Sequence, residues 1–235
     1  MAALTFQQAT GGSSASNNPS LTYGSGTTGG SFLVAWIGGV SASLSITAVP
    51  TDTLGNTWIQ ISTTQTYSTG LAAFYYVPSN KVSGGANTVQ FHTSGSVAQG
   101  FGIAEFTTQA TSSPLDQSNF ATFTSANSLA TFTSVSSAAA NEEVIAMFIS
   151  NGAQTFTSPG SGYATTALAG TLVLIEYGAF ATSGTQSVTG TLGTAGRAMI
   201  TCAISVKSTS TPAGGGGNSS WLTVNMNNSL RGLRH

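Results

Sequence analysis

Residues 32–39 read FLVAWIGG, and residues 144–152 read VIAMFISNG. Both stretches are short, rich in β-branched and aromatic residues, and bounded by glycine, which is typical of β-strands. Every position of VIAMFI is apolar, which indicates a central strand or a strand that a neighbouring layer covers. These two stretches predict an all-β fold.

Similar segments recur along the chain between clusters of Gly, Asn, Ser and Pro. In GIAEF and NTVQFH, apolar and polar residues alternate, which predicts one face in the core and one in water. No stretch of twelve residues has helical periodicity, so we expect almost no helix. Many short strands with frequent turns predict an antiparallel β-sandwich or jelly roll. The further strands are expected at 58–63, 71–77, 88–93, 101–107, 171–177, 187–192 and 197–207, with weaker candidates at 4–9, 20–23, 119–124 and 129–135.

The chain also repeats its motifs in one order. Five motifs of the first half correspond, in order, to five motifs of the second half. The pairs are FLVAWIGG and VIAMFISNG, TDTLGNTWIQIS and FTSPGSGYATT, LAAFYYVP and TLVLIEYGAF, GGANTVQFHTSG and SGTQSVTGTLG, and FGIAEFTT and RAMITCAISVKS. The offset of roughly 95 to 115 residues is too long for a solenoid. It predicts two related halves, 1–110 and 119–207, that share one sandwich or form two adjacent ones. The short connector 107–117 favours a single compact body over residues 1–207.

Charged residues are scarce. The 235 residues include 5 Lys and Arg and 6 Asp and Glu, with a formal net charge of −1, whereas about a quarter of the residues in an ordinary soluble protein are charged. No basic patch is available to neutralise phosphates, so we expect no nucleic-acid partner. The composition suits a scaffold that packs against many neighbours better than an enzyme.

Residue types that carry catalysis or bind metals are also few. The only histidines are His92 and His235, and no G-x-S-x-G motif is present. One cysteine, Cys202, cannot form an internal disulfide or a zinc cluster, and is expected to pack as a small buried apolar group. Asp52 and Asp116 lack the D-x-D-x-D spacing of a calcium loop and are better interpreted as turn residues. We therefore expect no cofactor and no enzymatic activity.

Two glutamates stand in apolar strands, Glu105 in IAEF and Glu176 in LIEY. A glycosidase would need two such carboxylates facing each other across a cleft. The simpler interpretation places each on the solvent face of its strand. Glu142 and Glu143 directly precede a hydrophobic strand, and are interpreted as charges that protect an edge against aggregation.

Aromatic residues offer one alternative. Trp36, Trp58, Tyr67, Tyr75 and Tyr76 could form a platform on which sugar rings stack, although core packing explains most of them. Within this hypothesis Trp36, Trp58 and Tyr75 are the candidate glycan contacts.

The end of the chain differs from the body. STSTPAGGGG at 208–217 has the composition of a flexible linker. The following residues, 218–235 (NSSWLTVNMNNSLRGLRH), are apolar and mildly basic, and are expected to form an arm that docks onto a partner or onto another copy of the chain. Docking could proceed by strand addition, with alternate side chains pointing to opposite sides. The docking residues are expected to be Trp221, Leu222, Val224, Met226, Leu230, Arg231, Leu233 and Arg234.

The first residues, MAALTFQQATGG, have no basic region, no apolar core and no cleavage site, so no secretory signal peptide is expected. The longest apolar run, 144–149, is too short to span a bilayer, so no membrane partner is expected. A hydroxyl-rich composition without an export signal fits a virion protein, which is made in the host cytoplasm. An extracellular or cell-surface location is the alternative.

The series FLVAWIGG, TDTLGNTW, LAAFYYVP, GGANTVQF, GIAEFTT and SSPLDQ resembles a Ser/Thr/Gly-rich β-sandwich family of bacterial surface proteins and phage structural proteins. The resemblance covers about residues 1–207, and its most specific parts are the D-T-L-G-N-T turn and the G-G-A-N-T-V strand entry. It implies a non-enzymatic binding or structural module, with no catalytic residues to transfer.

The leading hypothesis is a phage virion subunit (capsid decoration, cement or fibre-like) whose partners are other subunits or itself. The alternative is a carbohydrate-binding or adhesion module for a surface glycan.

Overall fold

The structure is a computed structural model. It describes residues 5–39, 41, 43–68, 70–78, 82–95, 97–107, 113–126, 129–137, 142–166, 168, 172–180, 183–194 and 196–207. The linker at 208–217 and the arm at 218–235 therefore lie outside the described residues. The described part of the chain contains strands and turns and no helix, and every strand pair is antiparallel. The predicted all-β, antiparallel sandwich architecture is confirmed.

The first half folds as two sheets that face each other. Sheet A has the order β1-β9-β3-β7-β5, with β6 also paired to β7, and sheet B has the order β2-β8-β4. Apolar side chains from both sheets, among them Ile37, Tyr75, Phe91 and Ile103, form the core between them. The strands are β1 (Thr5–Ser14), β2 (Ser20–Thr22), β3 (Phe32–Gly39), β4 (Ser45–Asp52), β5 (Ile59–Gln60), β6 (Gln65–Tyr67), β7 (Gly70–Val77), β8 (Thr88–Ser94) and β9 (Gln99–Thr107).

The second half also folds as two facing sheets. Sheet C has the order β10-β17-β12-β15-β14, and sheet D has the order β11-β16-β13. Val144, Phe148, Val188 and Met199 belong to the core between them. The strands are β10 (Leu115–Ala126), β11 (Leu129–Ser137), β12 (Glu142–Ser150), β13 (Phe156–Pro159), β14 (Ala164–Thr165), β15 (Val173–Phe180), β16 (Gly184–Leu192) and β17 (Arg197–Val206).

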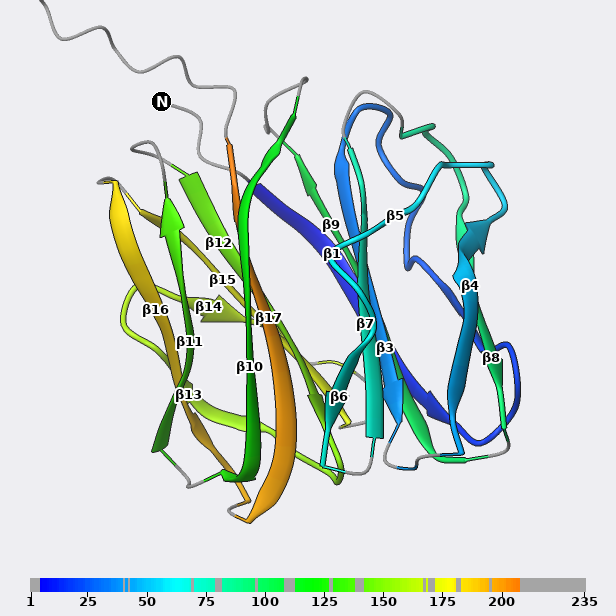
Figure 1. Ribbon diagram of the computed structural model, residues 1–235. Helices are drawn as coiled ribbons and strands as arrows, with labels where there is room; N and C mark the ends of the chain where they lie inside the picture. Colours follow the sequence, from blue (N-terminus) through cyan, green and yellow to red (C-terminus); the bar gives the residue numbers. More distant parts are fainter. Residues whose placement is uncertain are drawn as a thin grey trace, which may run out of the picture.

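A third core joins the halves. Figure 1 shows four layers, with sheets A and C in the middle and sheets B and D outside. Phe32, Val34 and Trp36 of β3 belong to the same central cluster as Met147 of β12 and Cys202 of β17. Of the two arrangements left open by the sequence, the structure shows two adjacent sandwiches in one body. Cys202 is fully buried, as predicted.

The middle position of sheet A explains why one sequence prediction is wrong. The alternation in GIAEF predicted a solvent face for β9, but the strand is buried on both faces. Sheet B covers one face of sheet A and sheet C covers the other, so apolar and polar residues of β9 are equally enclosed. In β8, which belongs to an outer sheet, the predicted alternation is confirmed.

The two halves share their strand order. Each strand of sheet A has a counterpart at the same place in sheet C: β10 for β1, β17 for β9, β12 for β3, β15 for β7 and β14 for β5. Sheets B and D correspond in the same way, with β11 for β2, β16 for β8 and β13 for β4. The irregularities match too: β1 has a bulge at Gln7 against β9, and β10 has one at Asp116 against β17. Descent of both halves from one duplicated unit, and the jelly-roll variant of the sandwich, stay predictions.

Candidate functional site

The most elaborate polar cluster lies at the end of β4, around Asp52. Its Oδ1 accepts hydrogen bonds from the backbone N–H of Leu54 (3.1 Å) and Asn56 (3.0 Å). Its Oδ2 accepts bonds from Asn56 Nδ2 (2.9 Å), Trp58 Nε1 (3.1 Å) and Asn87 Nδ2 (3.4 Å). Gly55, at the tip of the turn, has a φ of +70°, which glycine adopts without strain. We call these residues the Asp52 latch.

The Asp52 latch joins segments that are distant in sequence. Asn56 Oδ1 accepts a hydrogen bond from the backbone N–H of Ser83 (2.8 Å), and Tyr23 N–H donates to the backbone oxygen of Asn87 (3.1 Å). The D-T-L-G-N-T turn is thereby tied to the G-G-A-N-T-V entry into β8. The common physical role of these two motifs is to hold three loops at one end of the first sandwich.

The latch also decides between the two interpretations of Asp52. Five donors saturate its carboxylate, which is the arrangement of a turn residue rather than of a cation ligand. Asp116 lies in the other half of the molecule, on β10. The described residues contain no group of three or more His, Cys, Asp or Glu side chains placed to share a metal ion.

Glu105 is buried, which corrects the prediction of a solvent-facing side chain. It points from β9 into the core of the first sandwich, because its neighbours Ala104 and Phe106 point into the central core. Thr28 N–H donates to Oε1 (2.7 Å), and Gln8 Nε2 donates to Oε2 (2.5 Å). These bonds fasten the loop before β3 to the middle of sheet A, so the carboxylate has a structural role.

Glu176 is also buried, contrary to the same prediction, and faces the interior of the second sandwich. Its Oε1 accepts a bond from Gly160 N–H (2.6 Å), while Oε2 has no hydrogen-bond partner. Burial raises the pKa of Glu176 to about 7, although the bond from Gly160 opposes this shift. Glu105 and Glu176 therefore belong to different sandwich interiors, and the carboxylate pair that a glycosidase would need is not formed by these two residues.

Glu142 and Glu143 do not lie at a sheet edge, which corrects the interpretation that they protect an edge against aggregation. They begin β12, which lies between β17 and β15 in the middle of sheet C, and both are buried. Successive side chains of a strand point to opposite faces. Glu143 shares the face of Ile145 and Met147, which points into the central core. Burial raises the pKa of Glu143 to about 8.

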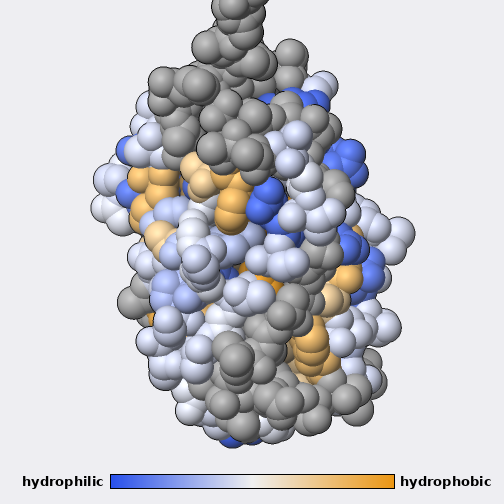
Figure 2. All heavy atoms as spheres, turned by 90° about the vertical axis from the view of Figure 1, so that its left-hand side faces the viewer, coloured by the Kyte–Doolittle hydropathy of each residue, from blue (hydrophilic) through white to orange (hydrophobic). Residues whose placement is uncertain are grey.

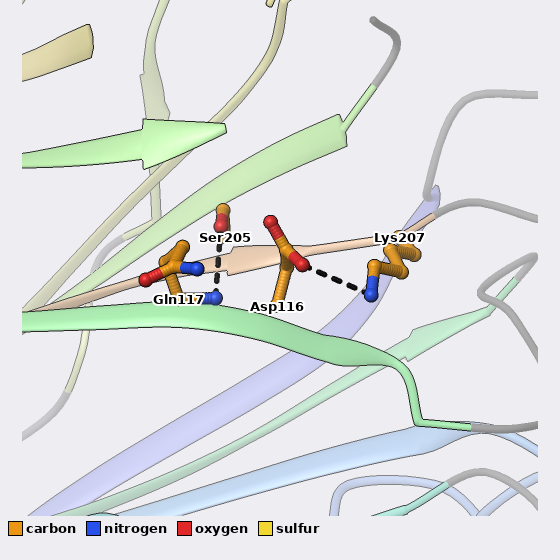
Figure 3. Close-up of polar contacts among 4 residues, drawn as sticks. All are labelled: Asp116, Gln117, Ser205 and Lys207. Atoms are coloured by element: carbon orange, nitrogen blue, oxygen red, sulfur yellow. Dashed lines mark hydrogen bonds and ion pairs between the residues drawn. The ribbon is translucent and has the colours of Figure 1, made fainter. Parts of the chain in front are cut away.

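A second polar contact, which we call the β10–β17 clasp, closes the bulge of β10 (Figure 3). Lys207 Nζ lies 2.9 Å from Asp116 Oδ1, and the backbone N–H of Gln117 donates to Ser205 Oγ (3.2 Å). At the matching bulge of β1, Gln7 Nε2 donates to Thr107 Oγ1 (2.9 Å). Both halves thus fasten the start of their edge strand to the end of the neighbouring strand, once with an ion pair and once with neutral groups.

The candidate glycan contacts are all in the interior, which corrects that hypothesis. Trp36 lies in the central core, Tyr75 lies in the core of the first sandwich, and Trp58 packs there with its Nε1 in the Asp52 latch. Their exposed fractions are 0%, 1% and 4%. A sugar ring cannot stack on rings that the protein covers. His92 lies on β8 with Nε2 3.0 Å from Thr51 Oγ1, as an ordinary strand residue.

The sequence marked Asp52, Gly55 and Asn56 as a turn that leads into Trp58, but it did not indicate that Asn87 joins them. Asn87 lies 35 positions from Asp52, and nothing in the spacing indicates that they meet. The candidate docking residues Trp221, Leu222, Val224, Met226, Leu230, Arg231, Leu233 and Arg234 lie outside the described residues.

No protein-family model matches the chain, and no curated protein or solved structure matches it either. No candidate for a membrane-crossing helix is found in the part of the chain that the structure describes.

The burial of acidic groups changes the charge of the folded protein. None of the six acidic residues is exposed, and the raised pKa values of Glu143 and Glu176 leave both partly protonated at pH 7. Folding should therefore make the net charge more positive by about one unit, and the isoelectric point of the native protein should exceed the value of 6.0 that the sequence gives. Isoelectric focusing without and with urea measures this difference. A native isoelectric point at or below that of the unfolded chain would contradict it.

Proposed function

We propose that this chain is a non-enzymatic structural subunit that packs against other copies or other subunits in a larger assembly. The observation that carries the proposal is the nature of the two outer sheet faces. Along the described part of these faces, most outward side chains are hydroxyls and amides, with one histidine and a few apolar residues such as Ala48 and Val49 of β4. Low surface charge limits repulsion between identical copies, and hydroxyl groups make hydrogen-bonded, hydrated contacts.

Sheet B shows this pattern on β8. Val89, Phe91 and Thr93 are buried, whereas the alternate residues Thr88, Gln90, His92 and Ser94 face outward. Polar side chains of the two neighbouring strands contact these outward residues. Thr22 Oγ1 of β2 lies 2.8 Å from Thr88 Oγ1, and Thr51 of β4 contacts His92. The described outer face of sheet B is therefore mainly polar, interrupted by Ala48 and Val49 of β4, and His92 is its one titratable side chain.

Sheet D shows the same pattern on β16. Val188 and Gly190 are buried, while Thr185, Ser187 and Thr189 alternate with them and are at least partly exposed. Figure 2, which looks onto this side of the molecule, shows mostly weakly polar residues, with hydrophobic residues in separate small areas. The described outward residues of β8 and β16 are thus similar in kind, which supports lateral packing in an assembly.

The assembly that we propose is a phage particle, with the chain as a capsid-decoration, cement or fibre-like subunit. The family resemblance of residues 1–207 supports this choice, as does the neutral exterior of the body. Its arm at 218–235 would dock onto a neighbouring subunit by strand addition.

Strand β1 is an edge suited to receive such an arm. It has ten residues without proline or charge, and it pairs with β9 without interruption from Gln8 to Ser14. Two other edges are less suitable. In sheet B, β4 contains Pro50 and two irregularities, and in sheet C, β10 carries the charged Asp116 and two irregularities. No strand pairs with the outer side of β1 among the described residues.

Deletion of residues 208–235 is expected to leave a folded monomer that no longer enters oligomers or particles, because the body keeps its three cores but loses the docking arm. Light scattering after size-exclusion chromatography, and incorporation into particles, measure this effect. Within the arm, replacing Leu222, Val224 and Met226 by serine should have the same result. The matched control replaces Thr223 and Asn225 by serine, which should leave assembly intact.

The receiving edge is tested in the full chain. Ser13→Lys places a charge on β1 and is expected to weaken association at least tenfold, by analogy with the charges that natural edge strands carry. Thr47→Lys, on the edge strand β4, is the control and should have little effect. Assembly that is unchanged by the deletion would refute docking through the arm, and equal effects of both lysines would refute β1 as its receiver.

A further inference from the structure

Glu143 stands where the first half of the molecule has a phenylalanine. On β3, Phe32 pairs with Phe106 of β9, and on β12, Glu143 pairs with Val206 of β17. The pairs correspond because Phe106 and Val206 occupy the same place relative to the matching bulges of β1 and β10. Phe32 is completely buried, and its ring lies 5.8 Å from that of Tyr76. The second half has an ionisable carboxyl group at this apolar position.

The surroundings of Glu143 belong to both halves. On the same face of sheet C, Tyr177 of β15 is its diagonal neighbour. Burial raises the pKa of Tyr177, and the charge of Glu143 adds to this shift. The Tyr177 ring stacks on Phe6 of β1 at 4.7 Å and meets Phe106 edge-on at 5.6 Å. We call Glu143, Tyr177, Phe6 and Phe106 the upper seam. It joins the N-terminal strand of the first half to the central sheet of the second.

No basic group of the described structure balances the carboxylate at the upper seam. The elements packed there present Phe6 from β1, Phe106 from β9, Val206 from β17 and the phenol of Tyr177 from β15. Lys207, which follows Val206, is engaged by Asp116 of β10. Glu142, the neighbour of Glu143 on β12, points to the opposite face. Glu143 is 3% exposed, and its Oε2 has no hydrogen-bond partner.

We propose that Glu143 is a proton-operated switch that keeps the upper seam closed when its carboxyl group is neutral and loosens the contact between the two halves when it ionises. A neutral carboxyl group fits among aromatic rings, whereas a carboxylate must be hydrated or paired. Ionisation therefore favours a state in which β1 separates from Tyr177 and water reaches Glu143. Such a loosening would act on β1 itself, which would couple pH to any partner that binds this edge.

The direction of the pH effect follows from the pKa values. Burial raises the pKa of Glu143 from 4.5 to about 8 in the closed seam, whereas an open, hydrated seam should return it toward the ordinary value. The closed state thus binds more protons between these values. Closure is strongest below about pH 4.5, weakens as the pH rises to about 8, and changes little above that. From pH 6 to pH 9 the opening equilibrium should increase by up to about a hundredfold.

Hydrogen exchange of the full chain tests the proposal, with each rate corrected for its intrinsic pH dependence. Protection of the amides in residues 5–9 is expected to fall by tenfold or more between pH 6 and pH 9. Glu143→Gln should abolish this fall, since it is neutral and of the same shape. Glu143→Phe, which restores the residue of the first half, should do the same. Glu176→Gln, which removes the other carboxyl group with a raised pKa, should leave the fall intact.

Titration of Glu143 by NMR gives an independent reading. An apparent pKa above 7 that coincides with the loss of protection in β1 supports the switch. A pKa below 6 would overturn the proposal, and so would protection of residues 5–9 that does not change between pH 6 and pH 9. A fall that persists in Glu143→Gln would assign the opening to another group and would overturn it as well.

Discussion

Replacing Trp36 with alanine is expected to lower the free energy of unfolding by about 4 kcal/mol, a typical cost for deleting a buried tryptophan. Trp36 is the largest fully buried side chain of the described structure, and it lies in the central core that joins sheets A and C. The cavity would open between the two sandwiches, where neither half can close it without shifting the other. Urea unfolding followed by circular dichroism measures the loss. Ile59→Ala, at a residue that is 40% exposed on β5, is the surface control and should cost less than about 0.5 kcal/mol.

Gly102 provides a specific test of the Trp36 packing. A Cβ atom added at Gly102 would lie 2.4 Å from the indole ring of Trp36, so Gly102→Ala should destabilise the protein by roughly 2 kcal/mol. In the Trp36→Ala background the same substitution meets no ring, and it should be neutral or stabilising. A double-mutant cycle measures this coupling. Additive effects of the two substitutions would show that the ring does not lie over Gly102.

Asp52→Ala is expected to lower the free energy of unfolding by about 3 kcal/mol, because it removes a charged acceptor and leaves the N–H groups of the Asp52 latch without their partner. Trp58 and Asn56 are buried, with exposed fractions of 4% and 8%, so water replaces the lost bonds only in part. The loss should appear in equilibrium unfolding and as faster cleavage of the loops between β4 and β8 by proteases.

Asp116→Ala is the matched control for the Asp52 latch. Asp116 is 9% exposed and its lysine partner is 40% exposed, so this single ion pair is expected to contribute about 1 kcal/mol, less than the five hydrogen bonds of the latch. Asp52→Asn should fall between the two, since an amide can still accept some of the five hydrogen bonds. Equal costs for Asp52→Ala and Asp116→Ala would contradict the latch.

The two halves use the same strand order with different polar chemistry. In the first half, the carboxyl groups of the half-buried Asp52 and the buried Glu105 are hydrogen-bonded and hold loops in place. In the second half, Glu143 and Glu176 each keep an oxygen atom without a partner, and burial raises both pKa values.

Local pattern alone determined much of this architecture. The apolar run at 144–149 predicted a central strand, and the run at 32–39 predicted a strand; β12 and β3 are buried at every position. The absence of helical periodicity correctly predicted that the described chain has no helix. Strand β4 was missed, since SITAVPTD contains a proline and lacks clean alternation; it lies at an edge of sheet B and is irregular. The region expected as a strand at 58–63 contributes only the two residues of β5.

The roles of individual polar residues depended on tertiary structure. A glutamate that alternates with apolar neighbours has the same sequence pattern whether its face meets water or a second sheet, because the pattern records strand geometry and not what lies above it. Glu105 and Glu176 are buried only because sheets B and D cover them, and Glu143 is buried because sheets A and C pack together. The partnership of Asp52 with Asn87 likewise exists only after β4 and β8 pair. The order of residues thus determined the strands and their turns, whereas the stacking of four layers decided which charges are enclosed.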